Sequence, residues 1–341
     1  MFKPFVSLVS LVLLATPAFA QTGDDTIGIR AQGMGGAFTA VADDATASWW
    51  NPAGLAGGAY FNALLETGSY REPSTERSTA GALNSAWRGE SRGLAVAFPA
   101  LGLSYYRLRV SEIHPQTSTA MTTGVRQDEG AVNVHLRSMV VDQLGATVGQ
   151  SLGNHFVVGS TFTLVTAGAA SDVRPASASS LDAANGLDAQ RETHVGLDVG
   201  AMASFGRARL GLTVRNLKEP SFGSGADAFT LRRHARIGAA MTSGSRGVIG
   251  SATLAFDADL TRTTTVLGDE RHVAAGAEAW TTGRTLGIRA GVSANTIGSP
   301  RTAFSGGASA AVKKGMYADA HVTGGADDSR RGWGAALRVT F

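Results

Sequence analysis

The sequence predicts an all-β protein: an antiparallel transmembrane β-barrel of about 14 strands, with a small N-terminal hatch, or plug, in its lumen. Three observations predict this fold. Apolar residues alternate with polar or small ones from about Tyr60 onward, as in strands with one apolar face. Many alternating runs reach the length of about 9–11 residues that a tilted strand needs to cross a bilayer. The last run ends on Phe341. A soluble β-sandwich also alternates, so the run lengths and the final residue distinguish the barrel.

The chain begins with a predicted secretory signal peptide. It reads MFKPFVSLVSLVLLATPAFA, with a basic Lys3, an apolar run and a small-x-small end at Ala18–Ala20. The apolar run is shorter than the about 20 residues of a transmembrane helix, although an uncleaved anchor is the alternative. We therefore expect residues 1–20 to be removed and the protein to reach the outer membrane of a Gram-negative-type bacterium. The expected parts are the signal peptide 1–20, the hatch 21–58 and the barrel 59–341.

Composition narrows the class of protein. The formal charge is +3, and removal of Lys3 alone leaves 3 − 1 = +2. The basic residues are scattered, so no nucleic-acid partner is expected. Glycine is abundant at 44 of 341 residues, and cysteine is absent. An exported chain without disulfides needs another source of stability, and a closed barrel supplies one by pairing every backbone N–H and C=O group within the bilayer.

The clearest predicted hairpin joins Val195–Phe205 to the run from Leu210 through a turn at Gly206. Short turns of this kind alternate with long polar stretches such as 168–192 and 218–229, which is the pattern of outer-membrane barrels. The stretch 70–87 alternates least clearly. Aromatic residues near run ends suit interfacial girdles. The charged residues expected to face the lumen are His135, Arg137, Asp198, Arg215, Asp257, Asp259, His272, Glu278, Arg289 and Arg338.

The C-terminal run, residues 333–341, places Trp333 and Phe341 on one face with the apolar residues between them. A terminal Phe on an alternating strand is similar to the signal read by the bacterial barrel-assembly machinery. We therefore expect that machinery and outer-membrane lipid to be partners of this chain.

The segment before the first convincing strand includes GMGGAFTAVADDATASWWNPAGLAGG at 33–58. A barrel of about 14 strands has a lumen too wide for its wall side chains to fill, so this segment is expected to plug it. Its glycines allow tight turns and close backbone approach. Asp43 or Asp44 can cap a short helix over Thr46–Trp50, and Pro52 ends it. The two tryptophans of this helix are expected to anchor the hatch on the inner wall.

The stretch GMGGAFTAVADDATASWWNPAGLA resembles the N-terminal signature of the FadL-like outer-membrane barrel superfamily, closest to the branch of PorV-type and conjugal-transfer TraF-like barrels. LGLTVRNLKEPSFG at 210–223 and HVAAGAEAWTTGRTLGIRAG at 272–291 extend the resemblance over most of the chain. It implies a fourteen-stranded barrel whose hatch carries Asn51, Pro52 and Ala53. The residues that it implies for the hatch and a ligand are Phe38, Trp49, Trp50, Asn51, Pro52 and Ala53.

The resemblance implies one of two functions. FadL-type members pass hydrophobic compounds, such as long-chain fatty acids or aromatic hydrocarbons, and release them through a lateral opening in the wall. PorV-type members instead act with a protein-secretion system. The expected function is passive uptake of a small hydrophobic molecule; the alternative is a surface barrel that binds a secretion or envelope-assembly protein and transports no small molecule.

No sequence pattern indicates catalysis. The glycines at 33–36 lack the Lys-Ser/Thr of a phosphate-binding loop, and the histidines lack zinc spacing. The stretch 307–311 is one residue short of a nucleophile elbow. We therefore expect no enzyme activity, no catalytic residues, no metal site and no cofactor.

Two features allow two interpretations each. Asp257 and Asp259 lie on one strand face. In the first interpretation they hold a cation or share a proton. In the second, which is favoured, they form a lumen pair whose charge is balanced by Arg289 or Arg215. Pro99 lies either in a short turn, which is favoured, or at a kink that opens a lateral exit.

Overall fold

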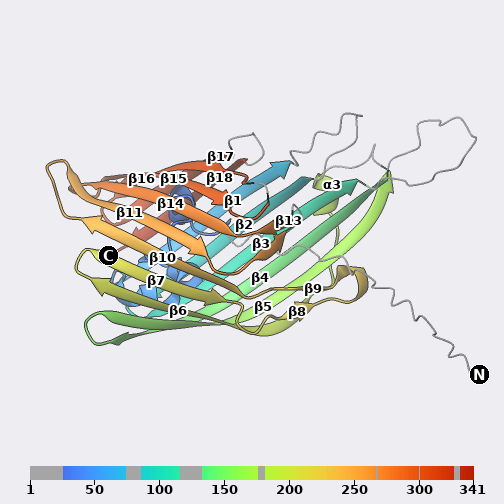
Figure 1. Ribbon diagram of the computed structural model, residues 1–341, viewed down its shortest axis with the longest axis horizontal. Helices are drawn as coiled ribbons and strands as arrows, with labels where there is room; N and C mark the ends of the chain where they lie inside the picture. Colours follow the sequence, from blue (N-terminus) through green and yellow to red (C-terminus); the bar gives the residue numbers. More distant parts are fainter. Residues whose placement is uncertain are drawn as a thin grey trace, which may run out of the picture.

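The computed structural model describes residues 26–73, 86–115, 133–175, 181–265, 268–298, 300–325 and 331–341. Within this part, fourteen strands pair in a closed antiparallel barrel, which confirms the predicted fold class (Figure 1). The predicted signal peptide lies outside the described residues and stays a prediction. No helix in the described part is long and apolar enough to cross a membrane.

The barrel strands have the following bounds: β1 Asn62–Pro73, β2 Ala86–Phe98, β3 Leu101–Pro115, β4 Asn133–Leu152, β5 Phe156–Pro175, β6 Glu192–Phe205, β7 Ala208–Arg215, β10 His234–Ser243, β11 Ile249–Asp259, β14 His272–Thr281, β15 Leu286–Asn295, β16 Ala303–Lys313, β17 Met316–Gly325 and β18 Arg331–Thr340. Two short pairs lie in the connections: β8 Ser221–Phe222 with β9 Phe229–Thr230, and β12 Thr263–Thr265 with β13 Gly268–Glu270. The helices are α1 Ile29–Gly33, α2 Ala47–Trp50, η2 Pro52–Gly57, α3 Leu181–Asn185 and η4 Gly225–Asp227.

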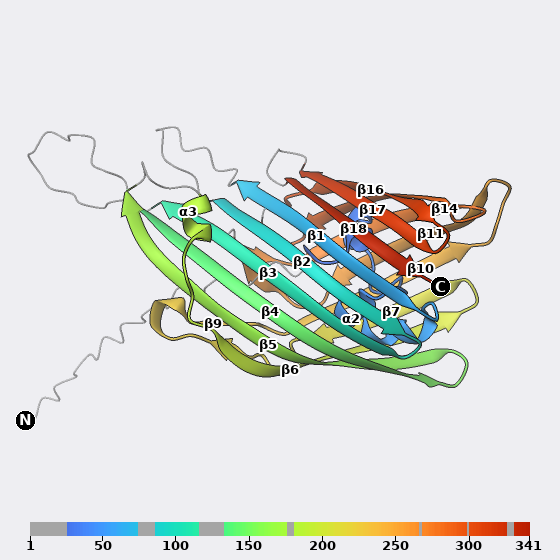
Figure 2. The same ribbon diagram turned by 180° about the vertical axis from the view of Figure 1, so that it is seen from behind.

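The two ends of the barrel differ. At the short-turn end, connections of two to five residues join the strands, such as the two-residue turn between β6 and β7, and the C-terminus lies there. At the other, long-loop end, the connections include α3, η4 and the two short strand pairs. β4 and β5 are the longest strands, at 20 residues each, and extend far toward the long-loop end (Figure 2). In the weakly alternating stretch, β1 ends at Pro73 and β2 begins at Ala86, and residues 74–85 lie outside the described part.

Alternation along each strand separates the two faces of the wall. In β6, Val195 is 56% exposed on the outer face, whereas Asp198 is 1% exposed on the inner face. Eight of the charged residues predicted to face the lumen are buried: Arg137, Asp198, Arg215, Asp257, Asp259, Glu278, Arg289 and Arg338. The other two, His135 and His272, are partly buried near the long-loop end. An apolar outer band with a polar interior is the arrangement of a transmembrane barrel.

The seam between the first and last strands closes at the short-turn end. The Phe61 N–H donates to the Phe341 carbonyl over 3.3 Å, and the Phe341 N–H donates to the Phe61 carbonyl over 2.9 Å. The Phe61 ring lies 6.2 Å from that of Phe341 and 5.5 Å from that of Phe98. The terminal Phe therefore takes part in barrel closure and in an aromatic cluster at the rim.

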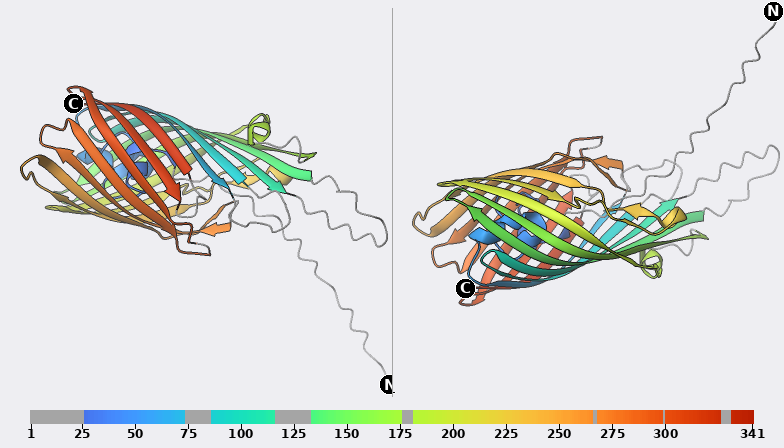
Figure 3. Two further views of the ribbon diagram at one scale, coloured as in Figure 1. Left: turned by 90° about the horizontal axis from the view of Figure 1, so that it is seen from above. Right: turned by 90° about the horizontal axis from the view of Figure 1, so that it is seen from below.

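Residues 26–58, the described part of the predicted hatch, lie inside the barrel near the short-turn end (Figure 3). Helix α1 contacts β15 to β18, and η2 contacts β3 to β6 across the lumen. We call residues 26–58 the hatch from here on.

Candidate functional site

The hatch is shaped by short helical turns. Helix α2 begins after its N-cap, Thr46, and has no side-chain cap, so the predicted cap by Asp43 or Asp44 is wrong. Asp44 Oδ1 instead accepts from the Thr46 N–H over 3.0 Å, just before the helix. Asn51 is extended, with φ −162° and ψ 102°, and ends α2 because the following Pro52 disfavours helical geometry. Pro52 then starts η2, and the Asn51 side chain accepts from the Ala53 N–H over 3.2 Å.

Arg30 joins the hatch to the wall through an ion pair. Its guanidinium donates to both oxygens of Glu278 on β14, over 2.7 Å from Nε and 2.5 Å from Nη2. It also contacts Asp43 and Asp44 of the hatch. Glu278 accepts a further bond from Arg289 Nε over 2.7 Å. Buried charges are tolerated when paired in this way, and two-point Arg–carboxylate pairs are among the stronger hydrogen bonds.

Two wall carboxylates hold the hatch by its backbone. Glu66 of β1 accepts from the N–H groups of Gly28 and Ile29 over 2.9 and 3.1 Å. Asp257 of β11 accepts from those of Phe38 and Thr39 over 3.0 and 2.8 Å. These bonds satisfy N–H groups at the start of α1 and in the turn around Phe38. A buried N–H group left without a partner would destabilise the fold.

The prediction that Arg289 or Arg215 balances the charges of Asp257 and Asp259 is wrong. Asp259 pairs with Arg236 over 2.6 Å and lies 3.0 Å from His234 Nε2, while Asp257 binds the hatch backbone. Arg289 instead binds Glu278, and Arg215 lies 4.0 Å from Asp198. The lumen charges are therefore balanced between neighbouring strands, and neither Asp257 nor Asp259 forms an ion pair with Arg289 or Arg215 among the described contacts.

Asn51 joins the hatch to β6. Its Nδ2 donates to the Thr39 carbonyl over 2.9 Å and to the Ala201 carbonyl over 3.2 Å. Its side chain is fully buried. Asn51 thus bonds two parts of the hatch and the wall at once, while Pro52 and Ala53 continue into η2.

The aromatic residues predicted for the hatch pack against lumen cations. The Trp49 ring lies 3.5 Å from the guanidinium carbon of Arg215, a close cation–π contact. The Trp50 ring lies 6.1 Å from that of Phe38, edge to face, and its Nε1 donates to the Ile27 carbonyl over 3.0 Å. All three aromatic residues are buried, and a ligand-binding role for them stays a prediction.

Inward-facing glycines let the hatch touch the wall backbone. A Cβ at Gly200 would lie 2.1 Å from Asn51 Oδ1, and one at Gly291 would lie 2.1 Å from the Met34 carbonyl carbon. Similar close approaches of the hatch occur at Gly159, Gly211 and Gly276. These positions explain part of the high glycine content, since any side chain there would meet the hatch.

Pro99 lies with Ala100 in the two-residue turn between β2 and β3, where Phe98 pairs with Leu101. The thirteen residue pairs between β2 and β3 run without a register shift from Ala86 to Phe98. The structure therefore has Pro99 in the favoured turn, and the wall shows no kink there.

Sequence reasoning missed Arg30 and Glu66, and it placed Asp257 and Glu278 in the lumen without their contacts to the hatch. Arg30 carried a signal, because it is the single basic residue of 21–58 and lies in a segment with four aspartates. No comparable signal indicated that Glu66 and Asp257 bind the hatch. Their partners are backbone N–H groups, which every residue except proline offers.

Residues 73–259 match the sequence model of the family described as "F plasmid transfer operon, TraF, protein". The match spans more than half of the 341 residues. The chain belongs to this family. Curated protein sequences gave no match to the TraF-family chain. A finer assignment to PorV-type barrels stays a prediction.

Solved barrels share the fold of this TraF-family chain. The toluene transporter TodX of Pseudomonas putida has a TM-score of 0.58 at 13% identity, with 92% of this chain and 98% of that chain covered. The toluene transporter TbuX of Ralstonia pickettii gives 0.58 at 11% identity, with 92% and 98% covered. A Pseudomonas aeruginosa FadL homologue gives 0.58 at 12% identity, with 95% and 99% covered. The TraF-family chain is thus similar in fold to FadL-family barrels along nearly their whole length.

Proposed function

We propose that the chain is an outer-membrane channel for small hydrophobic molecules, in which the hatch acts as a gate. The observation that carries the proposal is the way the hatch is held. Arg30, Gly28, Phe38 and their neighbours bind wall carboxylates through directional polar contacts. Such contacts can be broken and exchanged one at a time while the barrel wall stays paired. A gate needs this kind of attachment.

The solved relatives support the substrate class. TodX and TbuX are toluene transporters, and another similar barrel, CymD, is a monoaromatic hydrocarbon channel. In this chain, Phe38, Trp49 and Trp50 are the aromatic residues of the hatch, and they are buried between it and the wall. They are the groups that an apolar solute would meet as the hatch moves. We therefore propose aromatic hydrocarbons or fatty acids as substrates.

A second function is favoured by one observation, the continuity of the wall. Every neighbouring pair of the fourteen barrel strands is hydrogen-bonded, including β1 with β18. A lateral exit needs a break in this pairing. A barrel with a permanently closed hatch would instead serve as a protein-interaction component of a secretion or envelope-assembly system.

Native mass spectrometry of the protein extracted from outer membranes in mild detergent distinguishes the two functions. A barrel that carries one aromatic or acyl ligand supports the channel and identifies its substrate class. A ligand-free barrel that retains another envelope protein supports the interaction role.

Hatch removal tests the gate directly. Deletion of Gly33–Ala53 should raise single-channel conductance in planar bilayers and speed the uptake of radiolabelled toluene by cells. Because the deletion removes much of the lumen packing, Glu278→Gln provides a milder test in the full-length chain. Unchanged conductance and uptake in both folded variants would contradict a gating hatch.

A further inference from the structure

One row of paired residues crosses the outer face of seven neighbouring strands. From β16 to β4 the partners are Ala308, Ala320, Ala335, Thr67, Arg92, Arg107 and Asp142. The outward row next to it, on the short-turn side, is apolar or aromatic throughout: Ala310, Ala318, Leu337, Leu65, Leu94, Tyr105 and Leu144. Strands of such barrels tilt by about 35–45°, so a row across them climbs through the membrane. The first row changes from uncharged to charged residues between Thr67 and Arg92, and we infer that the boundary between hydrocarbon and headgroups lies there.

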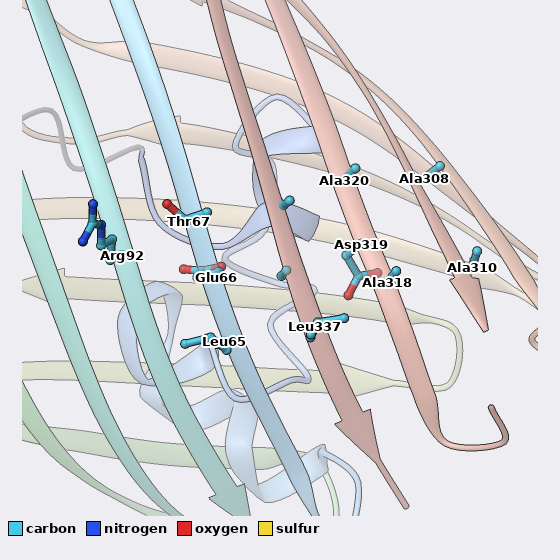
Figure 4. Close-up of a pocket in the computed structure, with 12 residues that line it drawn as sticks. Leu65, Glu66, Thr67, Arg92, Ala308, Ala310, Ala318, Asp319, Ala320 and Leu337 are labelled. Atoms are coloured by element: carbon cyan, nitrogen blue, oxygen red, sulfur yellow. The ribbon is translucent and has the colours of Figure 1, made fainter. Parts of the chain in front are cut away.

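An apolar groove of about 850 Å³ lies on the hydrocarbon side of this boundary. Alanines of β16, β17 and β18 make up half of its lining, among them Ala308, Ala320 and Ala335, and the inward-facing carboxylates Glu66 and Asp319 line it as well. Leu65 and Leu337 border it, and Arg92 of β2 lies at its edge (Figure 4). Methyl side chains leave a depression in a wall that otherwise presents large apolar residues, such as Leu94, to the membrane.

A second, polar cavity of about 380 Å³ lies on the headgroup side and shares Arg92. Its lining residues are Glu90, Arg92, Arg107, Arg109 and Asn185. Arg92 and Arg107 are direct partners across the β2–β3 ladder, an arrangement that is destabilising for like charges. The cavity is lined by three arginines and one glutamate, so it is electropositive.

The neighbouring acids leave this charge only partly compensated. Asp142 lies 3.8 Å from Arg107 Nε, but it also accepts from Tyr105 over 2.6 Å and from Arg191 over 3.0 Å. Arg109 Nη1 donates to the backbone and side chain of Asn185, at the end of α3, over 2.8 and 3.1 Å. Arg92 has no ion pair with any residue that the structure describes. An anion in the cavity would relieve the repulsion between Arg92 and Arg107.

We propose that these two cavities form one binding site for a membrane lipid with a phosphorylated headgroup. The phosphate lies between Arg92 and Arg107, because the planar guanidinium groups match its oxygens with paired N–H donors. The acyl chains lie in the alanine-lined groove. Arg92 is common to both cavities and so marks where the headgroup joins the chains. The lipid would lie on the outer wall, although the groove also reaches Glu66, whose carboxylate holds the start of the hatch.

The test measures lipid binding to the full-length barrel by native mass spectrometry, with diphosphoryl lipid A as the probe. Wild type should retain one lipid, and the double variant Arg92→Gln, Arg107→Gln should bind it at least about tenfold more weakly, a loss of about 1.4 kcal/mol. Arg246→Gln, in a turn at the short-turn end, is the matched control and should bind as wild type does. Retained affinity in the double variant would overturn the proposal.

Two further comparisons identify the ligand. The same lipid without phosphates should bind at least about tenfold more weakly, and inorganic phosphate alone should bind far more weakly than the lipid. Equal binding of the dephosphorylated lipid, or phosphate binding as tight as that of the lipid, would overturn the proposed lipid.

A bulky residue tests the groove. Ala320→Phe fills the groove and should weaken lipid binding, whereas Val322→Phe, on the same strand and face but outside the groove, should not. Equal affinity of these two variants would overturn the assignment of the acyl chains. Circular dichroism of each variant checks that the barrel is folded.

Discussion

Arg30 of the hatch and Glu278 of β14 form a two-point ion pair inside the barrel, although they are 248 residues apart in the sequence. Arg289 binds the same carboxylate from β15, so one glutamate lies between two arginines. Its side chain is 2% exposed. The Glu278 carboxylate therefore binds one arginine of the hatch and one arginine of the wall at the same time.

Glu278→Gln should loosen the hatch more than it disturbs the strands. It leaves Arg30 and Arg289 facing each other without a carboxylate between them, and breaking a buried pair typically costs about 3–5 kcal/mol. Urea unfolding followed by tryptophan fluorescence should show a loss of that order, and bilayer conductance should rise. Arg262→Gln is the control, because its pair with Asp269 is largely exposed and should contribute at most about 1 kcal/mol. Similar losses in the two variants would contradict a special role for Glu278.

Glu66→Gln should release the start of α1. A carboxamide offers one carbonyl oxygen, whereas Glu66 accepts from Gly28 and Ile29 with separate oxygens. We expect a loss of about 1–3 kcal/mol for a buried donor left unsatisfied. Hydrogen exchange of the two amides should accelerate, with Glu192→Gln, on the exposed end of β6, as the control. Unchanged exchange would show that the carboxylate does not hold α1.

Gly200→Ala should displace the Asn51–Pro52 turn. The added Cβ would lie 2.1 Å from Asn51 Oδ1 and 2.9 Å from Pro52 Cδ, so the hatch must move away from β6. Overpacking of this kind typically costs about 1–3 kcal/mol. Gly324→Ala is the matched strand variant, because a Cβ there has nothing within 4 Å. Chemical unfolding should separate the two variants, and equal stability would contradict the tight contact.

Removal of Phe341 should slow barrel assembly. The change deletes both hydrogen bonds to Phe61 and the ring contact at the seam between β1 and β18. Phe341→Tyr keeps the backbone pairing and the ring, and it should assemble nearly as wild type does. The yield of folded barrel in outer membranes and the rate of refolding into vesicles measure the effect. If only the yield in cells falls, the predicted recognition by the barrel-assembly machinery gains support over a purely structural role.

Much of the barrel could be predicted because its signal is local. A strand exposed to lipid on one face and to the lumen on the other must alternate, and the hairpin around Gly206 is readable from that pattern alone. The small additions α3, β8–β9 and β12–β13 were not predicted, because they lie in polar connections without periodicity.

The contacts of the hatch could not be predicted, because barrel closure determines them. Nothing near Arg30 in the sequence indicates β14. One missed pair was within reach: the register of the β10–β11 hairpin places Arg236 directly opposite Asp259. Arg289 and Arg215 were favoured instead because parity along a strand shows which face a side chain occupies, but not which neighbour lies beside it.

The close approach of hatch and wall has a consequence for how this chain can diverge. Gly159, Gly200, Gly211, Gly276 and Gly291 come from five strands but touch only a few hatch residues, among them Met34, Thr39 and Pro52. A substitution that gives one of these wall glycines a side chain is tolerated only if the hatch backbone opposite it also changes its path. Hatch and wall therefore evolve as one unit, while the outer face of the same strands is free to drift. Among homologues, identity should be concentrated on the inward positions of the short-turn half of the barrel.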